Sequence, residues 1–305
     1  NVGIEASEAL PILLFIGIGA MIDFGPLLSQ PVMFLFGAAA QFGIFFAICA
    51  AALMGFDLKD AASIGIIGAA DGPTAFFVAN LLGSKYTGAI IVVAYSYMAL
   101  VPIIQPPVIK LLTTKKERKI PMVYKQKDIP QIIKILFPVF VTMISGFVAP
   151  RSVSLVAFIM FGNLIRECGV LRSLSETAQT VLANLITILL GITVSLQMKA
   201  EQFLVLETLF ILLLGLLAFI FDTAGGILLA KFMNLFTKKK INPIIGAAGI
   251  SAFPMASRVA HKIGRSEDPN NFLLMHAVGA NMAGQIASVI AGGLLVSLVT
   301  SGMFG

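Results

Sequence analysis

The chain has 305 residues, of which 58% are hydrophobic and 12% are charged, whereas soluble domains carry roughly 25% charged residues. This composition excludes an ordinary soluble domain and indicates an integral membrane protein. The two His residues cannot make a metal cluster by themselves. Cys49 and Cys168 fall in apolar runs, as expected of buried free thiols.

Apolar runs of about the length that crosses a bilayer recur along the chain. We predict membrane segments at 9–22, 31–55, 62–83, 86–112, 130–149, 152–169, 176–197, 203–235 and 269–300. The first run is short and is expected to be the end of a span, and the run at 203–235 is long enough for two segments. Because the chain begins with Asn1 rather than Met, we expect further residues upstream. The sequence shows no secretory signal pattern.

Positive charge gathers in two places, the segment 113–129 and the Lys run 238–240. By the positive-inside rule both should face the cytoplasm. The alternative, a patch for nucleic acid or anionic lipid, is disfavoured because no aromatic residues are interleaved with the basic ones. We therefore predict a first transmembrane repeat at 1–112, a basic cytoplasmic loop at 113–129 and a second transmembrane repeat at 130–305.

Two apolar segments are interrupted by helix-breaking residues. The stretch IIGAADGPTAFFVA (66–79) carries Asp71 directly before Gly72 and Pro73, although a charge at membrane depth and a Pro inside a helix each cost several kcal/mol. Placing Pro73 on Pro254 aligns residues 67–83 with residues 248–264, with Gly, Ala and Val matches. Paired interruptions in two halves are typical of a transporter with a midplane site.

The predicted fold is an all-α polytopic membrane protein with two repeats, each containing an interrupted helix, at 62–83 and at 241–264. A transporter-like core and additional scaffold helices are expected. Inverted repeats require an odd number of crossings between corresponding points, whereas four predicted segments separate the basic clusters, so the sequence leaves the topology open.

Polar side chains surround both interruptions. The first half contributes Asp71, Thr74, Tyr95, Ser96, Tyr97 and Gln105, and the second contributes Asn242, Ser251, Ser257, Arg258, His261, Asn281, Gln285 and Ser288. Hard cations prefer such oxygens, whereas zinc and copper prefer His and Cys. A single carboxylate in an apolar setting can hold Na⁺ or take up a proton, so the sequence predicts a site for Na⁺ or H⁺ exchange.

Several of these residues also have a purely structural interpretation. Asp71 can cap the helix that starts near Pro73. Arg258 can pair with Asp71 or with a helix-end carbonyl, and Tyr95 and Tyr97 can be interfacial aromatic residues.

The same holds in the second half. Asn242 can be a helix cap, and Ser251 and Asn281 can be interhelical hydrogen-bonding groups. Asp222 and Glu207 stay without an assigned role.

Six stretches together resemble one known family, the β subunits of the sodium-pumping, biotin-dependent decarboxylases. They are AMIDFGPLL (20–28), GAAAQFGIF (37–45), ASIGIIGAADGPTA (62–75), AYSYMALVPIIQPPVIKLLTTKKERKI (94–120), KINPIIGAAGISAFPMASR (240–258) and NFLLMHAVGAN (271–281). The family includes oxaloacetate, methylmalonyl-CoA and glutaconyl-CoA decarboxylases, and the resemblance covers nearly the whole chain. This chain departs from the family pattern in reading GAN at 279–281 where GPN is expected, although Asn281 is kept.

The resemblance implies a subunit in the cell inner membrane that decarboxylates carboxybiotin and couples CO₂ release and proton uptake to outward Na⁺ transport. It implies three partners: a carboxyltransferase and biotin-carrier subunit, a small γ-type membrane subunit, and further copies of the chain in a trimer. Biotin is expected on the partner, because the stretch around Lys199 lacks the second Met of a biotin attachment site. The alternative is a self-contained Na⁺/H⁺ antiporter, which would share the broken helices and the carboxylate.

The resemblance also assigns roles by matching motifs. The residues implied in catalysis are Asp71, Arg258 and Tyr97. Those implied in holding carboxybiotin are Arg258 and Asn281. Those implied in binding Na⁺ are Asp71, Asn242, Gly246, Ser251 and Asn281.

Overall fold

The computed structural model describes residues 2–124, 128–197 and 205–301. Every regular element in these ranges is helical, and six helices are long and apolar enough to span a membrane. The predicted all-α polytopic membrane fold is confirmed. Lys199, which was considered as a biotin attachment site, lies outside the described residues.

The elements of the first part of the chain follow the predicted runs. In order they are α1 (Val2–Met21), α2 (Gly25–Ser29), α3 (Met33–Ala39), α4 (Phe42–Leu53), α5 (Leu58–Gly65), η1 (Ile66–Ala69), α6 (Gly72–Leu82), α7 (Thr87–Leu112) and α8 (Lys115–Arg118).

The second part continues with longer helices. In order they are α9 (Gln131–Val148), η2 (Pro150–Ser152), α10 (Val153–Glu167), α11 (Arg172–Thr177), η3 (Ala178–Leu182), α12 (Ala183–Gln197), α14 (Leu206–Phe236), α15 (Ile244–Ala247), α16 (Met255–Glu267) and α17 (Leu274–Thr300). The run at 203–235 is therefore one helix, α14, rather than two segments.

The membrane segment predicted at 31–55 is confirmed as the span Met33–Leu53, but the helix is interrupted between α3 and α4 at Ala40 and Gln41. Neither residue is a helix breaker, so no local pattern indicates this interruption. The backbone N–H groups at the start of α4 find their hydrogen-bond acceptor on another helix. The carboxylate of Asp222 on α14 accepts hydrogen bonds from the backbone N–H groups of Gly43 and Ile44, as an N-cap residue would.

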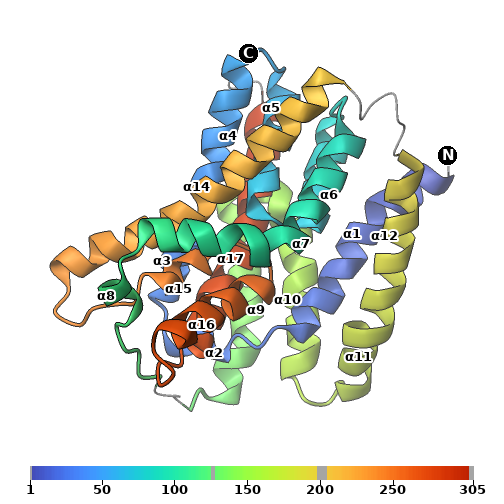
Figure 1. Ribbon diagram of the computed structural model, residues 1–305. Coiled ribbons are helices and arrows are strands. Elements are labelled where there is room, and N and C mark those ends of the chain that lie inside the picture. The colour runs from blue at the N-terminus through green and yellow to red at the C-terminus, as the bar shows by residue number, and fades with distance from the viewer. Residues whose placement is uncertain (1, 125–127, 198–204, 302–305) are drawn as a thin grey trace.

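Both predicted interruptions fold as short helices that turn back inside the protein. In the first, α5 and η1 end at Ala70, which adopts a left-handed conformation with φ of 52°, and α6 leads away. In the second, α15 ends at Ala247 and α16 begins at Met255. Figure 1 shows α5 beside α4 near the C-terminus, with α6 at the same end of the molecule, whereas α15 and α16 lie toward the opposite end, close to α2 and α8.

The order of a long segment, a broken pair and a long helix thus occurs twice, in residues 33–112 and 206–300. The two pairs approach the centre from opposite ends (Figure 1). The boundaries predicted at 112 and 130 stay predictions.

The two basic clusters lie at one end of the molecule. The side-chain amide of Asn242, which follows the Lys run, donates to the carbonyls of Arg118 and Ile120 at 2.8 and 2.9 Å. Lys231 Nζ lies 3.1 Å from Glu117 Oε1. This shared end is what the positive-inside rule requires of two loops on the same side of a membrane.

Glu117 is charged at neutral pH in this arrangement. Partial burial acts to raise the pKa of its carboxyl, but hydrogen bonds from Thr114 and from Lys231 outweigh burial and leave the pKa below its usual value. The ion pair that ties α8 to the end of α14 is therefore present at physiological pH.

Helices α1 and α10 pack closely through glycines. A Cβ atom at Gly162 would lie 2.0 Å from the carbonyl oxygen of Ile16, and one at Gly19 would lie 1.9 Å from that of Ile159. Small residues that bring backbones together are typical of membrane helix interfaces. With α12, these helices form a layer beside the broken pairs (Figure 1).

Gly162→Ala is expected to lower the midpoint of thermal unfolding in detergent, because the added methyl group overpacks the α1–α10 interface at a cost of about 1–3 kcal/mol. The matched control is Gly146→Ala in α9, where the nearest atom to a Cβ is 3.5 Å away. That variant should unfold at the wild-type temperature or above it, since Ala is the better helix former. Circular dichroism at 222 nm measures both, and equal midpoints would contradict the packing argument.

Candidate functional site

The two interrupted segments, α5–η1 with α6 and α15 with α16, are called broken pairs here, and the turn inside each, residues 69–71 and 247–254, is called its tip. The two tips meet in the protein interior. The backbone N–H and the hydroxyl of Ser251 both donate to the carbonyl oxygen of Ala69, at 3.2 and 2.6 Å. An unpaired carbonyl at membrane depth costs several kcal/mol. The second tip therefore supplies the partner that the break in the first tip requires.

Other side chains pair with the carbonyls of the second tip. The amide of Asn281 donates to the carbonyl of Ile250 at 2.6 Å, and Gln105 Nε2 donates to that of Ala247 at 2.6 Å. Both side chains are buried. The two long helices α17 and α7 thus hold the tip between them.

Asp71 begins α6 directly beside the meeting point. Its Oδ2 atom accepts hydrogen bonds from Thr74 Oγ1 at 2.7 Å, Gln285 Nε2 at 2.9 Å and Ser288 Oγ at 3.2 Å. Its Oδ1 atom accepts the backbone N–H of Thr74 at 3.4 Å. The carboxyl is therefore the N-cap of α6 and also the centre of a polar cluster that joins α6 to α17.

All of these donors are neutral. Within the described ranges, no Lys, Arg or His side chain forms a hydrogen bond or ion pair with Asp71. Asp71 is also buried, with 4% of its surface exposed. A charge at membrane depth costs about 3 kcal/mol even on the lowest scale, and interhelical hydrogen bonds in membranes return about 0.6 kcal/mol each. The two interhelical bonds, from Gln285 and Ser288 on α17, leave the charge only partly offset, which favours a bound cation or a proton.

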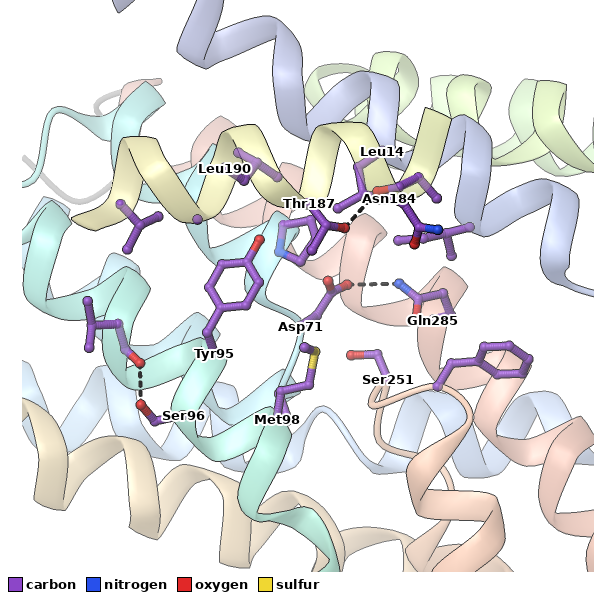
Figure 2. A pocket seen from close by; sticks show the side chains of 18 of the residues that line it. Leu14, Asp71, Tyr95, Ser96, Met98, Asn184, Thr187, Leu190, Ser251 and Gln285 are labelled. Carbon is purple, nitrogen blue, oxygen red and sulfur yellow. Dashed lines mark hydrogen bonds between the residues drawn. The ribbon is translucent and has the colours of Figure 1, made fainter. Parts of the chain in front are cut away.

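A cavity of about 630 Å³ opens beside the carboxyl. Figure 2 shows Asp71, Ser251 and Gln285 facing it, with Tyr95 of α7 alongside. The hydroxyl of Tyr95 is buried and has no hydrogen-bond partner in the described structure. The far wall is formed by α1 and α12, so the cavity separates the broken pairs from the α1–α10–α12 layer.

Tyr97 faces away from this cavity. Its hydroxyl donates to the carbonyl of Leu212 on α14 at 2.6 Å. Residues two positions apart on a helix point to nearly opposite sides, so Tyr95 and Tyr97 cannot both reach Asp71. The structure places Tyr95, and not the Tyr97 assigned by motif, beside the carboxyl.

Asn242 and Gly246 are also remote from the cavity lining. Asn242 holds the segment after α8 through Arg118 and Ile120, and its Oδ1 atom accepts the N–H of Ile244 at 3.1 Å. Gly246 lies against Gly226 of α14, where a Cβ would come within 2.0 Å of a carbonyl oxygen. In this conformation both residues position the second tip.

Arg258 and Asn281 lie in different environments. Arg258 on α16 is exposed and forms no ion pair with any described residue. Asn281 is 0% exposed, and its Oδ1 atom has no partner among the described residues. The structure therefore does not bring the two residues assigned to carboxybiotin onto one surface.

Six residues of the cluster and cavity were not among the residues assigned by the resemblance. Thr74, Tyr95, Gln285 and Ser288 belong to the polar groups noted around the interruptions. They were singled out only because they are polar side chains within apolar segments. Asn184 and Thr187 of α12, which line the cavity, were missed. Their spacing of three residues within an apolar run places both on one helix face, and that was the available signal.

Comparison with known proteins identifies the family. The family of the Na⁺-transporting oxaloacetate decarboxylase β subunit matches residues 1–299. The chain belongs to this family. The methylmalonyl-CoA decarboxylase subunit β of Propionigenium modestum is 53% identical over 289 residues, covering 94% of this chain and 73% of that protein.

Further members of the family show the same degree of similarity. A probable oxaloacetate decarboxylase β chain of Vibrio cholerae is 49% identical over 300 residues, covering 96% of this chain and 69% of that protein. The glutaconyl-CoA decarboxylase subunit β of Acidaminococcus fermentans is 49% identical over 292 residues, covering 96% and 78%. The chain is thus a membrane subunit of a Na⁺-transporting decarboxylase, which confirms the decarboxylase interpretation over the antiporter.

Thr74→Val is expected to weaken Na⁺ binding, because the isosteric change removes the shortest hydrogen bond to Asp71. Bonds to charged groups contribute about 1.5–3 kcal/mol, so the Na⁺ concentration that gives half of the maximal protection against thermal unfolding should rise about tenfold or more.

Thr142→Val serves as the control, because the hydroxyl of Thr142 in α9 donates to a backbone carbonyl, that of Pro138 at 2.8 Å, and Thr142 does not line the Asp71 cavity. An unchanged Na⁺ requirement in Thr74→Val would remove this residue from the ion site.

Proposed function

We propose that the chain receives carboxybiotin from a carrier on a partner subunit at the basic end of the molecule, and that it couples CO₂ release to outward Na⁺ transport through Asp71. The single observation that carries this proposal is the position of Asp71. It is a buried carboxyl with neutral donors only, at the point where two broken helix pairs meet. Paired interruptions around such a group are typical of ion sites in transporters.

Na⁺ is the transported substrate, and the oxygens around the cavity suit it. Asp71, Ser251 and Gln285 all line the cavity and offer carboxylate, hydroxyl and amide oxygens, which hard cations prefer. Asn281 does not line the cavity. It helps to position Ser251, because its side-chain amide donates a hydrogen bond to the carbonyl of the preceding residue, Ile250. Asn242 and Gly246 take part by fixing where that tip sits.

A proton can replace the cation on the same carboxyl. Loss of CO₂ from carboxybiotin consumes one proton, and a neutral Asp71 satisfies the same requirement for charge balance as a Na⁺-bound one. When Na⁺ leaves, the donors Thr74, Gln285 and Ser288 still hold the carboxyl in place. Asp71 would then alternate between the two ions without losing its position.

Arg258 is suited to bind an incoming carboxylate. Its side chain is exposed and carries no ion pair in the described structure, so its planar guanidinium is free for a bidentate contact. Carboxybiotin supplies the carboxyl group that leaves as CO₂. The structure offers no comparable role for Tyr97, whose hydroxyl bonds to α14, and we assign Tyr95 to the ion site in its place.

The complex proposed around this chain contains a carboxyltransferase with the biotin carrier, a small γ-type membrane subunit and three copies of the β chain, in the cell inner membrane. The names of relatives refer to oxaloacetate, methylmalonyl-CoA and glutaconyl-CoA. Because the carboxyl donor reacts on the partner subunit in this scheme, these different donors are compatible with one β-chain chemistry.

Asp71→Asn should abolish Na⁺ uptake driven by the carboxyl donor in liposomes that contain the whole complex, because the amide keeps the shape but loses the charge. Asp60→Asn is the matched control. Asp60 is also 4% exposed, but it accepts from Ser84 Oγ and from the N–H of Lys85, at 2.7 and 3.0 Å, at the end of the first broken pair.

Uptake of ²²Na⁺ is measured with and without avidin. The proposal requires substrate-dependent, avidin-sensitive uptake in wild type and Asp60→Asn, and uptake at the level of protein-free liposomes in Asp71→Asn. Equal uptake driven by a pH gradient on the isolated chain would instead establish an antiporter.

Arg258→Lys should slow decarboxylation about tenfold or more even at saturating Na⁺, because an ammonium group cannot make the bidentate contact of a guanidinium. Decarboxylation is followed with the whole complex at several Na⁺ concentrations. The half-saturating Na⁺ concentration should stay at its wild-type value, since Arg258 lies outside the Asp71 cluster. Wild-type turnover in this variant would remove Arg258 from the reaction.

A further inference from the structure

The wall of the Asp71 cavity that faces away from the broken pairs carries polar side chains of α12. Asn184, Thr187, Gly191 and Ser195 line the cavity from this helix. Their spacing of three or four residues places them on one helix face. Because α12 ends one of the six candidate membrane spans, these polar groups lie at membrane depth and face the cavity. The proposed transport reaction gives none of them a role.

Asn184 is the most polar of these residues, and its side chain forms no hydrogen bond with any described residue. Amide side chains within membrane spans usually pair with a neighbouring helix. Figure 2 shows Asn184 extending from α12 toward the part of the cavity where Asp71 and Gln285 lie. The Oδ1 atom of Asn184 is therefore available to a ligand in the cavity.

The hydroxyl of Thr187 can offer only lone pairs to the cavity. It donates its single proton to the carbonyl of Ala183 at 2.7 Å, so only the acceptor positions of the oxygen remain. Ser251 on the opposite wall is in the same state, because its hydroxyl donates to the carbonyl of Ala69. Gln285 uses its amide N–H on Asp71, which leaves its Oε1 atom as an acceptor.

Acceptor oxygens thus face the cavity from both walls, and no Lys, Arg or His is among its lining residues. We propose that Asn184 and Thr187 form the α12 side of the Na⁺ site, so that the ion is held between the broken pairs and the α1–α10–α12 layer. This inference rests on the proposed function, because it takes Na⁺ as the ion at Asp71.

The number of ligands supports a contribution from α12. Hard cations take about six oxygen ligands in proteins, whereas the opposite wall offers chiefly Asp71, Ser251 and Gln285. The amide oxygen of Asn184 and the hydroxyl oxygen of Thr187 are of the same chemical kind. Water completes the set, since the cavity of about 630 Å³ has room for several molecules of about 30 Å³ each.

The test measures protection of the purified complex against thermal unfolding in detergent, with NaCl as the probe and KCl at equal ionic strength as the reference. The isosteric variant Thr187→Val should raise the half-saturating Na⁺ concentration about fivefold. Asn184→Leu should raise it by a similar factor. The maximal protection should stay at the wild-type level in both, because Asp71 is intact. Thr187→Ser keeps the hydroxyl and should restore the wild-type Na⁺ requirement.

Thr193→Val is the matched control on the same helix. The hydroxyl of Thr193 donates to the carbonyl of Leu189 at 2.9 Å, which is the same bond to the preceding turn that Thr187 makes, but Thr193 does not line the cavity. Its Na⁺ requirement should equal that of wild type. A rise as large as that in Thr187→Val would mean that loss of a hydroxyl from α12 acts through helix structure, and the inference would be overturned.

Asp71→Asn, measured in the same assay, separates this inference from the proposed function. If Asp71→Asn loses the protection by Na⁺ while Asn184→Leu and Thr187→Val keep the wild-type requirement, the α12 side of the site is wrong and the Asp71 site stands. If Asp71→Asn is protected as wild type is, the ion is not at Asp71, and both proposals are overturned. If Asn184→Leu does not fold, the threonine variants decide the outcome.

Discussion

The structure depends on hydrogen bonds to the backbone groups that interrupted helices leave unpaired inside a membrane. A helix that stops at membrane depth leaves carbonyl and N–H groups without partners, and the bilayer core offers no water to pair with them. Here the partners come from elsewhere in the chain. Ser251 pairs with the first tip, Asn281 and Gln105 pair with the second, and Asp222 caps the restart at α4. These long-range bonds fix where the two broken pairs meet.

The same constraint explains why a carboxyl can be placed at this depth. The backbone must end at Ala70 and restart at Gly72, and an Asp is a favourable residue at such a restart. The side chain that caps α6 then lies in polar surroundings, among hydroxyl and amide groups from α6 and α17. Structural and transport roles for Asp71 are therefore compatible, since the cap holds one oxygen while the other faces the cluster.

Much of this fold was predictable, because composition and helix breakers act locally. The spans, the two interruptions and the position of Asp71 beside the first interruption follow from apolar run lengths and from Gly and Pro positions. The features that were not predicted depend on how helices pack in three dimensions. The break before α4 depends on the carboxylate of Asp222, which caps Gly43 from 179 residues away in the sequence. The choice between Tyr95 and Tyr97 depends on which face of α7 meets the tip. The exposed position of Arg258 and the remote position of Asn242 likewise reflect packing of α16 and of the segment after α8 that no local pattern encodes.

The contact between the two tips affects whether residue covariation in the family can reveal that contact. Ser251 bonds to the backbone carbonyl of Ala69 and not to its side chain. Position 69 is restricted only by the space around it, whereas position 251 requires a small hydrogen-bond donor. Substitutions at the two positions therefore have no reason to compensate one another. Residue covariation would miss the contact that joins the two halves of the protein.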